Sequence, residues 1–190
     1  MKQKTRAILS LVFIGVVAST VAVATQTPGR TQAPVYLATC SEFSLQTGQN
    51  LQNGNAELAY LDSDLATGMK YRTDLPKNAA MLFHMAGARD VAFWMQDTPS
   101  SLDIAFFGRE GYLTHLERSA EPYSEELIRA PGSPVISYVL EVPAGQADAL
   151  GMVVDETRLD VASPTTCPNR DQGDSFMSHL NVTFPSEALQ

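Results

Sequence analysis

Short hydrophobic segments alternate with short polar segments through the middle of the chain. Short runs of aliphatic and aromatic residues are bounded by Gly, Pro, Asp or Ser, which is the pattern of β-strands. Gly108–Gly111 has the composition of a tight hairpin turn. The pattern predicts a mainly β domain, compact, antiparallel and sandwich-like or barrel-like. The expected strands are 56–61, 81–85, 91–95, 102–107, 112–116, 135–142 and 157–161.

One or two short helices interrupt this β pattern. Asp62, Ser63 and Asp64 can cap a helix that follows the first strand. Residues 143–151 place a proline at a helix start and a glycine just past its end. Residues 119–134 are rich in proline and acidic residues, so we expect a surface loop there.

The segments on either side of this region are more polar. Residues 25–55 are rich in Thr, Gln, Asn, Gly and Ser, which predicts a flexible lead-in with one short strand around 35–37. Residues 162–190 return to Ser, Thr, Pro, Asn and Asp and are expected to form a polar C-terminal extension. The predicted β domain therefore covers 56–161.

Residues 1–24 have the pattern of a secretory signal peptide. A basic stretch precedes an apolar run, and Ala22-Val23-Ala24 is a small-x-small cleavage site. The alternative is an uncleaved anchor, for which the apolar run is short. Both interpretations predict a periplasmic or secreted domain, and the second adds a membrane attachment through this segment alone.

In an oxidising compartment, two cysteines tend to form a disulfide. Cys40 and Cys167 lie near opposite ends of the mature chain, and we expect them to form a disulfide. The alternatives are free thiols or a metal pair, although neither cysteine has a second thiol or a histidine near it in sequence.

The charge balance excludes one class of partner. The chain has 13 basic and 21 acidic residues, a formal net charge of −8. Removing Lys2, Lys4 and Arg6 with the signal leaves 13 − 3 = 10 basic residues against 21, or −11. Nucleic-acid binding needs clustered Lys and Arg, so it is not expected. An apolar content of 44% with 18% charged residues is typical of a globular domain.

Several ordered blocks resemble one family. They are Gly68–Pro76, Met81–Phe83, Phe93–Thr98 with Leu102–Ile104 close behind, and Val139–Gly145 followed by Gly151. In this order they are similar to the landmarks of the domain of unknown function 192 family, over about 56–161. The resemblance implies a compact, mainly β domain, often exported, with no established activity.

The chain departs from the family pattern next to Trp94. Gln96-Asp97 replaces a usual Lys-Asn pair, and the usual proline before Leu102 is displaced to Pro99, with Ser101 in its place. If these positions shape a ligand loop in relatives, this chain is expected to bind something different or nothing.

Arg72, Asp103 and Glu141 are the strongest polar candidates. Both carboxyl groups fall within apolar runs, where they need a cation or several donors, and Arg72 offers a planar guanidinium. One hypothesis is that the three groups converge in a ligand pocket, or in a carboxylate pair for hydrolysis. The structural alternative is that Arg72 ties Asp103 to a loop while Glu141 accepts the first amides of the helix after Pro143.

A second cluster contains soft ligands. Thioethers and imidazole select Cu(I), so a copper site is an alternative, although strand alternation separates neighbouring members and methionine more often fills core gaps. We expect no metal site and no cofactor. An exposed Trp94 would indicate a ligand surface rather than core packing. The soft residues are Met81, His84, Met85, Trp94 and Met95.

No catalytic motif with a recognised spacing is present in the sequence. The expected function is a small binding or accessory module of the cell envelope rather than an enzyme. Its ligand would be a small molecule or envelope component, in a pocket that includes Arg72, Trp94, Asp103 and Glu141. The alternatives are a hydrolase of envelope saccharide or ester using Asp103 and Glu141, and a structural partner-binding domain with an exposed apolar patch.

Overall fold

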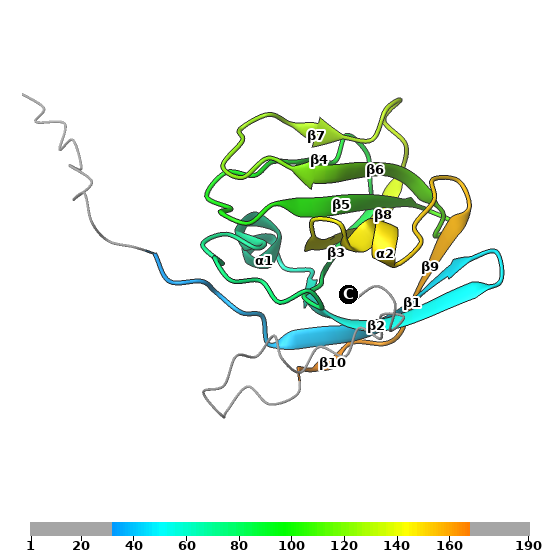
Figure 1. The fold of residues 1–190 in the computed structure, drawn as a ribbon, viewed down its shortest axis with the longest axis horizontal. Helices are drawn as coiled ribbons and strands as arrows, with labels where there is room; N and C mark the ends of the chain where they lie inside the picture. Colours follow the sequence, from blue (N-terminus) through cyan, green and yellow to red (C-terminus); the bar gives the residue numbers. More distant parts are fainter. Residues whose placement is uncertain (1–31, 168–190) are drawn as a thin grey trace, which may run out of the picture. The chain divides into compact units, whose positions relative to one another are not determined.

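A computed structural model describes residues 32–167, which form a mainly β domain with two short helices (Figure 1). The fold class predicted from the sequence is confirmed. The strands are β1 (Thr39–Thr47), β2 (Asn50–Ala59), β3 (Met81–Ala88), β4 (Ala92–Phe93), β5 (Leu102–Gly108), β6 (Leu113–Ala120), β7 (Ile128–Arg129), β8 (Ile136–Pro143), β9 (Thr157–Val161) and β10 (Thr165–Thr166). The helices are α1 (Asp62–Thr67) and α2 (Gln146–Ala149).

The main sheet has the order β10-β1-β2-β3-β8-β5-β6, with β9 also paired to β1. It curls through the domain in Figure 1, and β4 and β7 form a separate two-stranded sheet. All pairs are antiparallel except β2 and β3, which run parallel. A parallel pair needs a crossover connection, and the segment that contains α1 supplies it. The antiparallel prediction is therefore wrong for this one pair.

The β1–β2 hairpin is the largest difference from the predicted lead-in at 25–55. The two strands pair along their whole length, and Gly48 takes a φ of +58° in the tight turn between them. Phe43 lies opposite Gly54, and a Cβ at Gly54 would come within 2.4 Å of the Phe43 ring. The Phe43 ring therefore fills the space that a side chain at Gly54 would occupy. This contact helps to bury a strand whose polar, glycine-containing sequence alternates only weakly.

Other local predictions are corrected as well. The proline-rich segment 119–134 includes the end of β6 and the short strand β7, which pairs with β4. The expected strand at 91–95 is reduced to the two residues of β4, and residues 35–37 form no strand.

The main sheet is buried on both faces, which explains why its central strands read as continuous apolar runs. Alternate residues of β8 belong to different cores: Leu140 packs in the first and Val139 in the second. The first core includes Ala147 and Leu150 from α2 and its C-terminal end. The second includes Met69 and Met95 from the connections.

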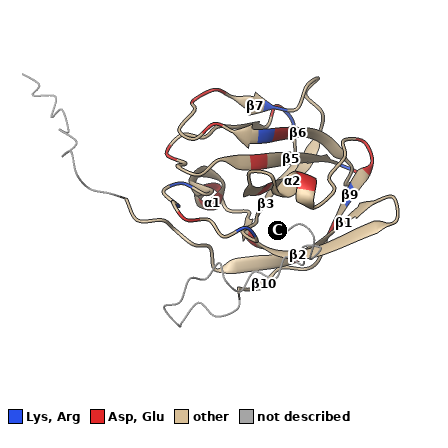
Figure 2. Cartoon of the chain, in the orientation of Figure 1, with Lys and Arg blue, Asp and Glu red and all other residues tan. Residues whose placement is uncertain are grey.

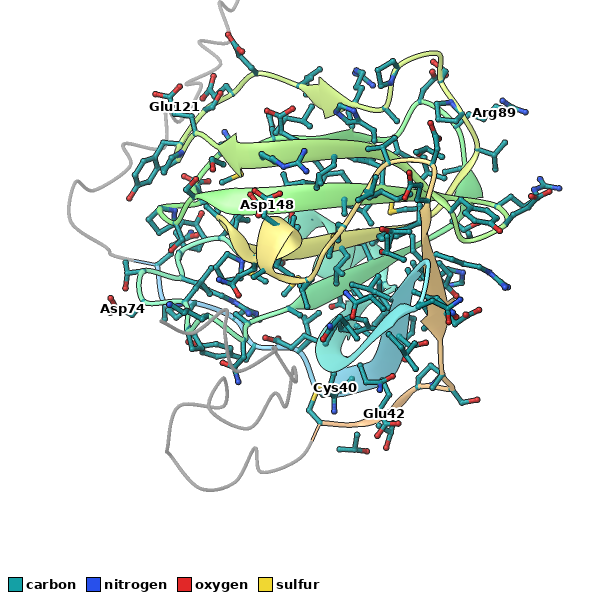
Figure 3. All side chains as sticks on the ribbon, turned by 45° about the vertical axis from the view of Figure 1, so that its right-hand side comes forward. Cys40, Glu42, Asp74, Arg89, Glu121 and Asp148 are labelled. Atoms are coloured by element: carbon teal, nitrogen blue, oxygen red, sulfur yellow. A yellow bond between two sulfur atoms is a disulfide. The ribbon has the colours of Figure 1, made fainter. Side chains whose placement is uncertain are left out.

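The Cys40–Cys167 disulfide is confirmed, and it closes a sequence separation of 127 residues (Figure 3). It joins the start of β1 to the chain just after β10. The predicted signal segment 1–24 and most of the extension 162–190 lie outside the described residues. Within 32–167, neither helix has the length and hydropathy needed to cross a bilayer.

Candidate functional site

Four side chains form a row across one face of the main sheet. Glu57 on β2 lies opposite Met81 on β3, Met81 opposite Glu141 on β8, and Glu141 opposite Ile104 on β5. Residues in register on adjacent strands share a face of the sheet, so two carboxyl groups flank Met81. Their backbones are about 10 Å apart, the width of two strand spacings.

Arg72 neutralises the first of these carboxyl groups. Its Nη1 donates to Glu57 Oε1 at 2.6 Å and its Nη2 to Oε2 at 2.9 Å, which is a bidentate pair with both side chains buried. The Leu37 amide also donates to Glu57 Oε2, at 2.6 Å. Arg72 Nη2 donates to the Val35 carbonyl at 2.6 Å, so the pair also holds the chain before β1. This cluster is structural.

Glu141 has no such compensation. The residue is 5% exposed, and its Oε2 has no hydrogen-bond partner among the described residues. Burial raises its pKa from 4.5 to about 8, against a smaller opposing effect of the Arg72 charge. At neutral pH the carboxyl group is therefore mainly protonated, and it can donate a hydrogen bond where an ionised carboxylate could only accept one.

Glu141 lies in the wall of a pocket of about 340 Å³, within the range of small-ligand sites. Because Trp94 is 44% exposed and Glu141 is buried, Trp94 lies at the rim and Glu141 at the inner end. The apolar lining is Leu65, Ala66, Gly68, Met69, Phe83, Met85, Ala92, Phe93 and Trp94. The polar lining is Asp62, Thr67, Lys70, Thr98 and Glu141.

A strained pair of residues supports the rim. Tyr71 and Asp97 have φ angles of 63° and 59°, a conformation that non-glycine residues rarely adopt. The Tyr71 amide donates to the Asp97 carbonyl at 2.8 Å, and the Tyr71 hydroxyl donates to Asp97 Oδ2 at 3.1 Å. Desolvation and the Asp97 carboxylate both raise the pKa of Tyr71, which keeps the donating proton in place. The departure Gln96-Asp97 therefore shapes the loop that follows Trp94.

Lys70 lies at the same rim. Its Nζ is 5.7 Å from the centroid of the Trp94 ring, a cation–π contact. No carboxylate of residues 32–167 lies within salt-bridge distance of Lys70. The pocket thus combines an aromatic rim with an ammonium group and a protonated acid at its inner end.

Asp103 lies on the opposite face of the sheet from Glu141, which corrects the hypothesis that Arg72, Asp103 and Glu141 converge. Its partner on β8 is Val142, the neighbour of Glu141, and successive residues of a strand point to opposite faces. Figure 2 shows one acidic segment on β5, which is Asp103 because that strand has no other acid. The carboxylate pair proposed for hydrolysis does not form.

The structural roles expected of these acids are also exchanged. Asp103 Oδ2 accepts the Ala147 amide of α2 at 2.9 Å, and Oδ1 accepts the Ser119 amide of β6 at 2.9 Å. The acid that receives the helix amides is thus Asp103 and not Glu141. Arg72 pairs with Glu57 rather than with Asp103.

The soft residues do not form one cluster. Met81 and Met95 are fully buried in the core, whereas His84 is exposed and stacks on Tyr138 with ring centroids 5.0 Å apart. Strand alternation separates His84 from Met81 and Met85. Within 32–167, no group of three or more His, Cys, Asp or Glu side chains is arranged to hold a metal ion.

Of the four predicted pocket residues, Trp94 and Glu141 line the pocket, Arg72 lies outside its lining and Asp103 lies across the sheet. Sequence reasoning missed Glu57 and Lys70. Glu57 carries a signal, because it is an acid inside an apolar strand just as Asp103 and Glu141 are. Lys70 carries none, since a single lysine in a turn has the pattern of a solvated side chain.

The sequence of the β domain belongs to a known family. The DUF192 family, described as "Uncharacterized ACR", matches residues 43–159, and the chain is a member of it. The match begins within β1, earlier than the boundary at residue 56 expected from sequence, because the β1–β2 hairpin is part of the domain.

Two solved structures are similar to this chain. One, a protein proposed to be a transcription regulator from Sinorhizobium meliloti 1021, has 30% identity and a TM-score of 0.59, covering 68% of this chain and 98% of its own. The other, a protein of unknown function from Novosphingobium aromaticivorans DSM 12444, has 26% identity and a TM-score of 0.59, covering 72% and 98%. No curated protein matches this chain.

Proposed function

We propose that the protein is a binding module for a small organic ligand, which occupies the pocket between Trp94 and Glu141. The observation that carries the proposal is Glu141, which lines the pocket and whose buried Oε2 has no hydrogen-bond partner among the described residues. A buried polar atom without a partner destabilises the fold by about 1–3 kcal/mol. A ligand with an oxygen that accepts a hydrogen bond from the Glu141 carboxyl group would recover this energy.

We further propose that the domain acts outside the cytoplasmic membrane, as an envelope binding or accessory module. Two features support this location. The first is the basic, apolar and small-residue order of 1–24. The second is the Cys40–Cys167 disulfide, since such bonds persist in oxidising compartments.

The fluorescence of Trp94 tests the binding proposal directly, because the chain has one tryptophan. The probes are cyclohexanone, cyclohexanecarboxylate and N-acetylglucosamine, which absorb little at the excitation wavelength. Binding of a probe is expected to shift the emission of Trp94 and to reduce its quenching by acrylamide, because the ligand excludes water and quencher from the indole.

A double variant provides the matched control. Tyr112 is 45% exposed, nearly the same as Trp94, and it lines a separate pocket with Arg109 and Val135, so it also reports whether the probes distinguish the two cavities. In Trp94→Phe with Tyr112→Trp, the reporter moves away, and the same probes should leave its emission unchanged. Equal responses in both proteins would show nonspecific adsorption and would reject the pocket.

A further inference from the structure

Lys70 and Glu141 are two polar groups of the Trp94 pocket, and they differ in kind. The Lys70 ammonium lies over the Trp94 ring at the rim, and no carboxylate of residues 32–167 is within salt-bridge distance of it. The Glu141 carboxyl group lies at the inner end, and its buried Oε2 has no hydrogen-bond partner among the described residues.

We infer that the ligand is an organic anion with two oxygen functions at opposite ends of an apolar body. Its anionic group pairs with Lys70 at the rim, and an oxygen acceptor at its inner end takes the hydrogen bond from the protonated Glu141. This inference rests on the proposed function and adds the charge and polarity of the ligand to it.

The surrounding charges favour an anion over a cation. The positive charge of Arg72, which acts on Glu141, is neutralised by its ion pair with Glu57. The inner end of the pocket therefore carries no net charge as long as Glu141 is protonated. A cationic ligand would need Glu141 to ionise in an apolar environment and would meet Lys70 at the rim. Asp62 opposes an anion, but it is exposed at the start of α1, where water and salt screen its charge.

The lining between the two polar groups suits a cyclic or aromatic body. Phe93 packs edge-on against Phe83 with centroids 4.9 Å apart, and Met85 and Trp94 also line this part of the pocket. Rings of fixed orientation and an adaptable thioether present apolar surface without a hydrogen-bonding group.

Four matched probes separate the contributions, with binding measured by Trp94 emission and by calorimetry. They are 4-oxocyclohexanecarboxylate with both functions, cyclohexanone with the acceptor alone, cyclohexanecarboxylate with the anion alone, and cyclohexylammonium with a cation. The expected order of affinity places 4-oxocyclohexanecarboxylate first and cyclohexylammonium last.

Variants assign each end. Lys70→Met is expected to weaken 4-oxocyclohexanecarboxylate about two- to fivefold, the scale of an exposed ion pair, and to leave cyclohexanone unchanged. Glu141→Leu is expected to weaken both ketones by about two- to tenfold, the scale of one hydrogen bond. Glu141→Gln keeps a donor at this position and should restore most of that loss.

The outcomes distinguish the two proposals. Cyclohexanone binding as tightly as 4-oxocyclohexanecarboxylate, or cyclohexylammonium binding most tightly, overturns the anionic ligand while the pocket remains a binding site. If no probe changes Trp94 emission or produces heat, both the binding function and the inference drawn from it are rejected.

Discussion

Glu141 is a carboxyl group among apolar side chains, and its proton is held more tightly in the folded protein than in the unfolded chain. Its pKa rises from 4.5 to about 8 on folding. Between these two values the folded state binds the extra proton, so the free energy of unfolding falls as pH rises, by up to about 1.4 kcal/mol per pH unit. Below 4.5 both states are protonated, and this contribution no longer changes.

Glu141→Gln tests that linkage because glutamine has the same shape and no proton to lose. Urea denaturation at pH 5, 6.5 and 8 should show a smaller decline in unfolding free energy for the variant than for the natural chain. Glu42→Gln is a matched control, since Glu42 is exposed on β1. Parallel curves for Glu141→Gln and the natural chain would show that Glu141 does not titrate in this range.

At the scale of elements, Asp103 joins three of them, because one carboxylate of β5 accepts amides from α2 and from β6. Asp103→Asn retains a single acceptor oxygen and turns an NH₂ group toward one of these amides. The expected loss is about 1–3 kcal/mol of unfolding free energy, with faster hydrogen exchange at the Ala147 and Ser119 amides.

Asp148 supplies the control for this change. It lies on α2 with an exposed side chain, paired with Arg118 at 3.0 Å, and is labelled in Figure 3. Asp148→Asn should cost less than about 1 kcal/mol, as exposed pairs do. An Asp103→Asn variant that loses no more than Asp148→Asn would contradict the bridging role of Asp103.

The sequence predicted the central strands well because they are buried on both faces, so that continuous apolar runs mark β5 and β8. It missed β1 and most of β2, where Ser41, Gln52 and Gly54 occupy inward positions that carry little apolar signal. Burial there depends on Phe43 covering Gly54, which is a contact between strands and not a property of either one.

The candidate site was predictable only in part for a related reason. Acids within apolar strands identified Asp103 and Glu141, and Trp94 was a candidate because it lies in the family block Phe93–Thr98. Whether two such acids share a face depends on strand register, and a shift of one residue reverses the answer. The register here places Glu57 and Glu141 on the same face of the sheet, on either side of Met81. It places Asp103 on the opposite face.

At the scale of the whole molecule, the disulfide links the two ends of the described chain. Replacing both cysteines, in Cys40→Ser with Cys167→Ser, should lower the unfolding free energy by about 2–5 kcal/mol, because the unfolded chain regains the freedom of a long loop. Urea denaturation of the natural chain, with and without reductant, gives the same comparison without substitution.

The proposed export of the chain leads to a prediction about the redox state of its two cysteines. When the full chain is produced in a bacterial host, alkylation of free thiols should leave Cys40 and Cys167 unmodified in the periplasmic or secreted fraction. A version without residues 1–24 should remain in the cytoplasm with both thiols reactive. Retention of the full chain in the cytoplasm would reject the proposed location, whatever the pocket binds.

The residues just before β1 have a mechanical consequence. The chain at Val35 is held by the Arg72 guanidinium, Leu37 by Glu57, and Cys40 by its covalent bond to Cys167. Tension applied to the chain at residue 32 would therefore meet two hydrogen bonds, at Val35 and Leu37, and then the disulfide at Cys40, where the ladder between β1 and β2 begins. We therefore expect the segment before β1 to resist extension until these two hydrogen bonds break.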